Sequence, residues 1–158
     1  MLSFRSKLFL FVSVAVAFLL TGCRGNLLYS GMVNTNDAWA KEDAARFVVP
    51  VTDTVDRYNF YVDIRHTGKY RFSNLYLFMQ TRFPDSTYTR DTLEITLATP
   101  EGKWLGKGWG EIKENHVLLR SKFRFPVKGN YVFLIWQGMR TDTLKAVRGI
   151  GIDIEKVD

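Results

Sequence analysis

The sequence has few of the residues that build covalent cross-links and metal sites. Its 158 residues include one cysteine, which excludes an internal disulfide and a cysteine-rich zinc module. Its two histidines, His66 and His116, stand far apart in the chain and leave little for a histidine metal site. It contains no HExxH, P-loop, G-x-S-x-G or G-x-G-x-x-G motif. We therefore expect neither a cofactor nor an enzymatic activity.

Long hydrophobic runs are also lacking, apart from one near the amino terminus. Leu8 to Leu20 is interrupted by a single polar residue, Ser13. A helix of that length reaches about 20 Å, which is short of the roughly 30 Å hydrocarbon core of a bilayer. Because the run follows the basic residues Arg5 and Lys7, it is typical of a secretory signal, and we assign residues 1–22 to a signal peptide.

The only cysteine directly follows this run. Leu20-Thr21-Gly22-Cys23 resembles a bacterial lipobox, in which an aliphatic residue and two small residues precede a lipid-modified cysteine. Its thiol would accept diacylglycerol, and cleavage before it would free an amine for a third chain. Two or more chains hold a protein stably on a membrane. The alternative is an ordinary signal peptide followed by a chance cysteine. We predict lipid attachment at Cys23, with residues 23–36 as the lipidated end and tether.

The charge balance and the residues after Cys23 bear on localisation. The formal net charge is +6 at pH 7, and this moderate excess could favour an anionic envelope surface. Secretion makes nucleic acid an improbable partner. No aspartate directly follows Cys23, the position that marks inner-membrane retention in many envelopes, and no acidic export signal follows it. We expect anchoring to the outer membrane, on its periplasmic face.

From Phe47 onward, apolar and polar residues alternate with a period of two, which is typical of half-buried antiparallel strands. The clearest run, Arg57 to Arg65, places Tyr58, Phe60, Val62 and Ile64 on one face. Similar runs cover residues 74–83, 92–99, 117–125, 130–137 and 150–154. The run at 130–137 is apolar on both faces and should be a central strand.

Turn sequences separate these runs, including one expected at Glu114-Asn115 beside His116. A stretch rich in Ala, Lys and Glu predicts a short helix or helical turn near residues 36–45. The spacing of the strands predicts a single all-β domain over residues 37–158, an antiparallel β-sandwich with at most that one helix.

Three sets of side chains are candidates for ligand or partner contact. Trp104 and Trp109 lie in a glycine-rich stretch and could stack on a sugar or a protein, although Trp104 could instead close the core. Tyr61 is a further exposed aromatic candidate for partner contact. A basic stripe could contact an anionic polymer or an acidic partner, or simply be solvated. The stripe consists of Arg120, Lys122 and Arg124.

The third set is acidic. Carboxylates in sandwich loops can bind Ca²⁺, although solvated turn residues are the simpler interpretation. The residues concerned are Asp85, Asp91 and Glu94.

Several motifs in a fixed order together resemble the gliding-motility lipoprotein GldH family over essentially the whole mature chain. In order, they are Trp39, Phe47, Arg65, Tyr70, Ser73-Asn74-Leu75-Tyr76-Leu77-Phe78, Gly102-x-Trp104-x-Gly106-x-Gly108, Gly129-x-Tyr131-x-Phe133, Gln137-Gly138-Met139-Arg140, Leu144 and Gly149-Ile150-Gly151. The resemblance implies an outer-membrane lipoprotein associated with gliding on surfaces. It carries over one functional position, Cys23, and no catalytic residue.

Three functional classes therefore compete. An anchored component of an envelope machine, which works through contact with envelope proteins, fits best. A carbohydrate-binding sandwich that uses Trp104 and Trp109 is the alternative. A hydrolase is third, because the sequence shows no nucleophile–base arrangement.

Overall fold

The computed structural model describes residues 26–157, which form antiparallel β-strands joined by turns and loops, with no helix in that range. The predicted signal peptide and Cys23 lie outside the described residues. Within residues 26–157, no helix is long and apolar enough to span a membrane. The strands are β1 (Leu27–Asn34), β2 (Ala38–Ala40), β3 (Ala45–Val51), β4 (Arg57–Thr67), β5 (Asn74–Arg82), β6 (Tyr88–Thr96), β7 (Ile112–Phe123), β8 (Gly129–Gln137), β9 (Thr143–Lys145) and β10 (Val147–Val157).

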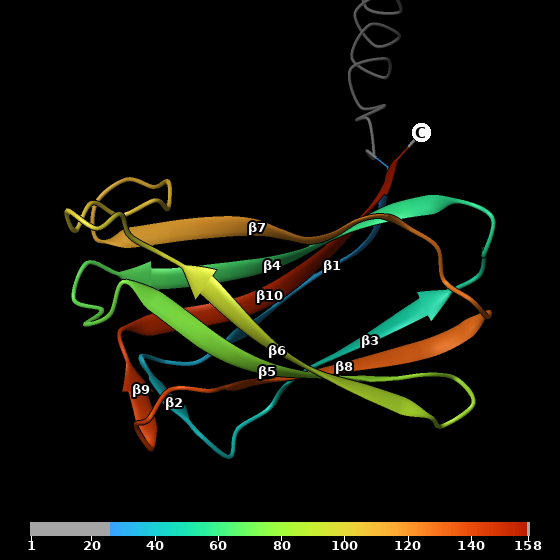
Figure 1. The fold of residues 1–158 in the computed structure, drawn as a ribbon, viewed down its shortest axis with the longest axis horizontal. Coiled ribbons are helices and arrows are strands. Elements are labelled where there is room, and N and C mark those ends of the chain that lie inside the picture. Colours follow the sequence, from blue (N-terminus) through green and yellow to red (C-terminus); the bar gives the residue numbers. More distant parts are fainter. Residues whose placement is uncertain (1–25, 158) are drawn as a thin grey trace, which may run out of the picture.

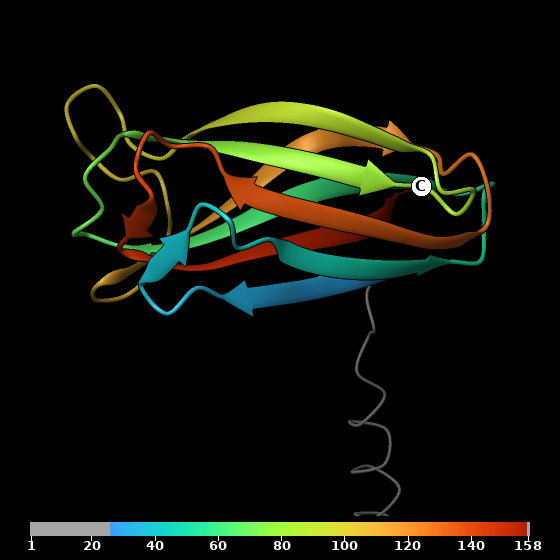
Figure 2. The same ribbon diagram turned by 90° about the horizontal axis from the view of Figure 1, so that it is seen from below.

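Two four-stranded sheets face each other as the layers of a sandwich. One has the strand order β1-β10-β4-β7 and the other β3-β8-β5-β6, and a small β2-β9 sheet lies at one end (Figure 1). The strands of both layers run roughly along the length of the molecule (Figure 2). All pairings are antiparallel, which confirms the predicted all-β sandwich.

The core lies between the layers and follows the predicted alternation. On β4, the side chains of Tyr58, Phe60, Val62 and Ile64 are buried while their neighbours alternate outward. On β10, the run predicted at residues 150–154 sends three fully buried isoleucines into the same core. The strand predicted to be central, β8, lies between β3 and β5, as expected for a segment that is apolar on both faces.

The helix predicted near residues 36–45 is wrong. Ala38–Ala40 forms strand β2, which pairs with β9, and Trp39 is buried with its indole N–H donating to the carbonyl of Asp43 at 2.7 Å. Asn36 and Asp37 have φ values of 50° and 64°, so they form a left-handed turn and not a helix cap. Helix propensity is a weak preference, and burial of the indole overrides it here.

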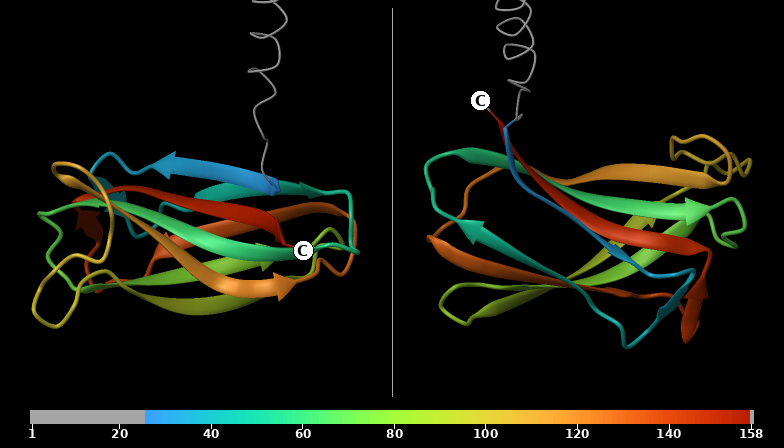
Figure 3. Two further views of the ribbon diagram at one scale, coloured as in Figure 1. Left: turned by 90° about the horizontal axis from the view of Figure 1, so that it is seen from above. Right: turned by 180° about the vertical axis from the view of Figure 1, so that it is seen from behind.

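Two other segments also differ from expectation. Residues 27–34, predicted as part of the tether, form β1, whose first residue Leu27 pairs with Glu155 at the end of β10 (Figure 3). The turn predicted at Glu114-Asn115 is absent, because both residues lie inside β7. Asn115 is buried there and lies opposite Ile64. The two polar residues were predicted to form a turn, although they belong to the interior of a strand.

Candidate functional site

An apolar cavity lies where the two layers are open at one side. Strands β6 and β7 are edge strands of different sheets, and each pairs with a neighbour on one side. Between them the sandwich interior opens into a cavity of about 380 Å³, which we call the β6–β7 groove. That volume falls in the range typical of ligand-binding sites.

The wall of the β6–β7 groove is a set of packed aromatic and aliphatic side chains. Ring centroids are 5.0 Å apart for Phe60 and Phe133, 4.9 Å for Phe123 and Phe125, and 4.8 Å for Phe125 and Tyr131. Such tilted and edge-on contacts hold the rings in place. The other apolar lining residues are Met79, Phe83, Leu93, Leu119 and Pro126.

Polar side chains from both strands border the β6–β7 groove. Arg120 and Arg124 contribute from β7 and the segment after it, while Thr89 and Asp91 contribute from β6. Among the described residues, neither arginine has an ion-pair or side-chain hydrogen-bond partner. Two guanidinium groups beside an apolar cavity favour an occupant that carries both apolar and acidic groups.

The members of the predicted basic stripe do not all lie at the groove. Two of its members line the β6–β7 groove, whereas Lys122 is not among the lining residues. Lys122 has a φ of 49°, and its backbone N–H donates to Asn59 Oδ1 at 3.0 Å, where the β4–β7 register shifts. A bulge of this kind re-aims the side chains along a strand.

The two candidate tryptophans lie in different environments. Trp104 is partly buried and packs against His66, with ring centroids 4.6 Å apart, and against Tyr70. Trp109 is 100% exposed in the loop before β7. No aromatic contact joins the two indoles in the described part of the chain, so they do not form a shared stacking platform.

Tyr61 belongs to a cluster on the outer face of the β1-β10-β4-β7 sheet. Its ring stacks on His116, with centroids 4.0 Å apart and an interplanar angle of 18°. His116 Nδ1 donates to Asp63 Oδ1 at 2.6 Å, and Asp153 Oδ2 lies 4.0 Å from the same nitrogen. Burial raises the pKa of Asp63; the hydrogen bond from His116 opposes this, and the nearby charge of Asp153 adds to it.

Sequence reasoning missed this cluster, because its members come from β4, β7 and β10. The signal that could have found it is that Asp63 falls on the polar face of the alternating run in β4. The ligand atoms of Asp63, His116 and Asp153 lie within 4.8 Å of one another, a donor set that could hold a divalent cation such as Zn²⁺.

The carboxylates considered for Ca²⁺ are not brought together. Asp85 accepts hydrogen bonds from Thr87 in its own turn, and Glu94 accepts one from Asn74. Because successive side chains of a strand point to opposite faces, Asp91 faces the β6–β7 groove and Glu94 does not.

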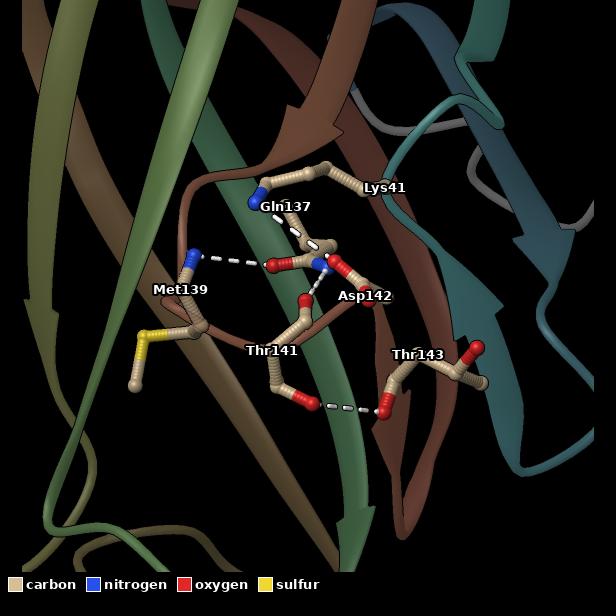
Figure 4. Close-up of polar contacts among 6 residues, drawn as sticks. All are labelled: Lys41, Gln137, Met139, Thr141, Asp142 and Thr143. Atoms are coloured by element: carbon tan, nitrogen blue, oxygen red, sulfur yellow. Dashed lines mark hydrogen bonds and ion pairs between the residues drawn. The ribbon is translucent and has the colours of Figure 1, made fainter.

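The Gln137-Gly138-Met139-Arg140 motif has a structural role that its position explains (Figure 4). Gln137 is fully buried at the end of β8, where its Oε1 accepts from the Met139 N–H at 2.8 Å. Its Nε2 donates to the carbonyl of Thr141, also at 2.8 Å. One amide side chain thus satisfies two backbone groups of the turn that leads to β9.

Comparison with known proteins agrees with this fold and its motifs. The "GldH lipoprotein" family matches residues 28–154. The gliding motility lipoprotein GldH homolog of Christiangramia forsetii is 29% identical, over 98% of this chain and 99% of its own. The gliding motility lipoprotein GldH of Flavobacterium johnsoniae is also 29% identical, over 93% of this chain and 96% of its own.

Among solved structures, a family 35 carbohydrate-binding module from Clostridium thermocellum aligns with 77% of this chain and 97% of its own. The TM-score is 0.32 and the sequence identity 11%. A likeness at that level carries no functional argument. The family match spans nearly all of the described strands, and two relatives align along almost their whole length. The chain therefore belongs to the GldH lipoprotein family.

Proposed function

We propose that this protein is an outer-membrane-anchored, non-catalytic component of the gliding machinery that binds an envelope partner through the β6–β7 groove. The relatives' names supply the link to gliding, and the lipobox at Cys23 supplies the anchor. The observation that carries the proposal is the pair of arginines without an ion-pair partner, Arg120 and Arg124, beside an aromatic-walled cavity in the described domain.

The energetics of such a surface favour a protein contact. Interface anchors are enriched in aromatic residues and arginine, and they lie in pockets from which water is excluded on binding. The β6–β7 groove offers packed rings such as Phe123, with the two guanidinium groups at its border. A partner that buries an acidic group between those arginines gains charge-assisted hydrogen bonds, and these bonds are partly shielded from water.

The Asp63–His116 pair is not part of a serine–histidine–aspartate arrangement. The Asp63–His116 pair has the geometry of an oriented base, so a nucleophile near it would suggest hydrolysis. The serine in the adjoining hollow, Ser30, lies on β1, with β10 and β4 between it and β7. At about 4.8 Å per strand, its backbone is roughly 14 Å from that of His116.

The test is photocrosslinking in living cells. A photoreactive amino acid placed at Thr89, on the border of the β6–β7 groove, should capture an envelope protein. The same probe at Lys103, which is exposed in the loop between β6 and β7 and does not line the groove, serves as the matched control. The double variant Arg120→Glu/Arg124→Glu should reduce capture at least about fivefold, which corresponds to roughly 1 kcal/mol of binding.

A charge-matched control separates the groove from overall charge. Lys69→Glu/Arg71→Glu changes the net charge by the same amount at exposed positions and should leave capture unchanged. Equal capture from Thr89 and Lys103, or no loss in the arginine variant, would contradict the proposal. If the purified protein instead binds a defined glycan and Trp109→Ala abolishes that binding, the carbohydrate-binding alternative replaces it.

A further inference from the structure

Each main sheet has two edge strands, and three of these four edges carry features that hinder pairing with another chain. The β1–β10 pairing shifts register near Leu27, and β3 contains Pro50, which cannot donate a backbone hydrogen bond. β7 has two register shifts beside Phe60 and a positive φ at Lys122. Bulges, prolines and distorted ends are the usual means by which proteins block edge-to-edge association.

The fourth edge, β6, lacks these features. From Tyr88 to Thr96 it pairs with β5 residue by residue, with no shift in register. It contains no proline and no glycine, and its outer side is not covered by another strand of the described chain. Its charged residues are Arg90, Asp91 and Glu94, and of these Asp91 alone lines the β6–β7 groove, as an inward-pointing charge that discourages pairing.

Resting on the contact proposed above, we infer that β6 receives an extended segment of the envelope partner as an added strand. Main-chain groups of the segment pair with the free edge of β6. Because side chains alternate along a strand, every second residue of the segment points into the β6–β7 groove. Those residues are apolar, since they meet Leu93, Leu119 and Phe123.

Charge adds a second requirement for the segment. The β6–β7 groove presents Arg120 and Arg124 on the β7 side against Asp91 on the β6 side, which leaves it net positive. An acidic residue in the segment therefore gains contact with the arginines. Asp91, in contrast, repels such a segment at the edge itself, so it weakens binding while it keeps the free edge from pairing with unrelated chains.

The experiment maps the register of the captured partner. Photoreactive residues are introduced separately at Thr89 and Asp91 of the full-length protein in cells, and the crosslinked partner residues are identified by mass spectrometry. An added strand requires both probes to capture one segment at positions two residues apart, a step of about 7 Å along a strand. Asp91→Asn should raise capture from the Thr89 probe at least about threefold, because a like charge is removed.

The outcomes separate the two proposals. If Thr89 captures no envelope protein above the Lys103 control, the contact at the β6–β7 groove is itself refuted. If it captures a partner but the two probes reach unrelated segments, or helical positions, the contact stands and strand addition is refuted. Unchanged or lower capture with Asp91→Asn, in a protein whose circular dichroism is unaltered, also refutes strand addition.

Discussion

Replacement of Gln137 by methionine should destabilise the protein by about 3 kcal/mol. Methionine keeps the length and nearly the volume of glutamine, so the change removes polar atoms without opening a large cavity. Two backbone groups then lose their partners, the buried Met139 N–H and the part-buried Thr141 carbonyl. Each unsatisfied buried group costs about 1–3 kcal/mol, and the Thr141 carbonyl falls at the low end because it is partly accessible to water.

Urea unfolding followed by tryptophan fluorescence measures this loss, and a thermal melt should show a decrease of about 10 °C for a domain of this size. Thr141→Val is the matched control in the same turn. It removes an exposed hydrogen bond to the Thr143 carbonyl and should cost no more than about 0.5 kcal/mol. A loss below about 1 kcal/mol for Gln137→Met would show that the turn finds other partners and would refute a structural role for this motif.

Three further predictions concern stability. Burial lowers the pKa of His66; the hydrogen bond with the Thr67 carbonyl opposes this, and the nearby charge of Lys113 adds to the lowering. The unfolded chain therefore binds a proton more readily than the folded protein does. The free energy of unfolding should therefore fall as pH drops below about 6.5, by up to roughly 1.4 kcal/mol per pH unit, and urea titrations of His66→Leu should show a weaker dependence. Gly108→Ala should cost more than Gly110→Ala in the same assay, because both have positive φ but a Cβ at Gly108 alone would collide with the Ile112 carbonyl. Trp109→Ala should leave the melting temperature within about 2 °C, since the indole is fully exposed.

The layered fold could be predicted from the sequence because alternation reports directly on burial. Strands with one buried face, such as β4, repeat the pattern over enough residues to identify both faces. The errors arose where local composition and tertiary context disagree. Residues 27–34 alternate poorly because β1 is an edge strand in which no side chain is fully buried, so neither of its faces has to be apolar. The helix-like composition around Trp39 is overridden by burial of that one side chain.

The candidate site could be predicted only in part, and the reason is geometric. Arg120 and Arg124 are close in sequence, so a stripe on one strand was visible. The opposing residues, Thr89 and Asp91, come from a strand about thirty positions earlier, and only the packing of two sheets brings them to the same opening. The bulge that turns Lys122 away depends on its pairing with Asn59, which no local pattern reports.

The same pairings that shorten the tether also determine where the β6–β7 groove lies relative to a lipid on Cys23. Leu27 pairs with Glu155, and at the same end of that sheet Tyr58 pairs with Phe123, which lines the groove. Leu27 lies four residues after Cys23, so the two residues are at most about 14 Å apart when the chain between them is extended. With lipid at Cys23, the Phe123 end of the groove is therefore held close to the membrane surface, whereas Trp109 lies at the opposite end of the sandwich. A partner segment that reaches β6 must then run near the membrane, which favours a membrane-associated envelope protein over a freely diffusing one.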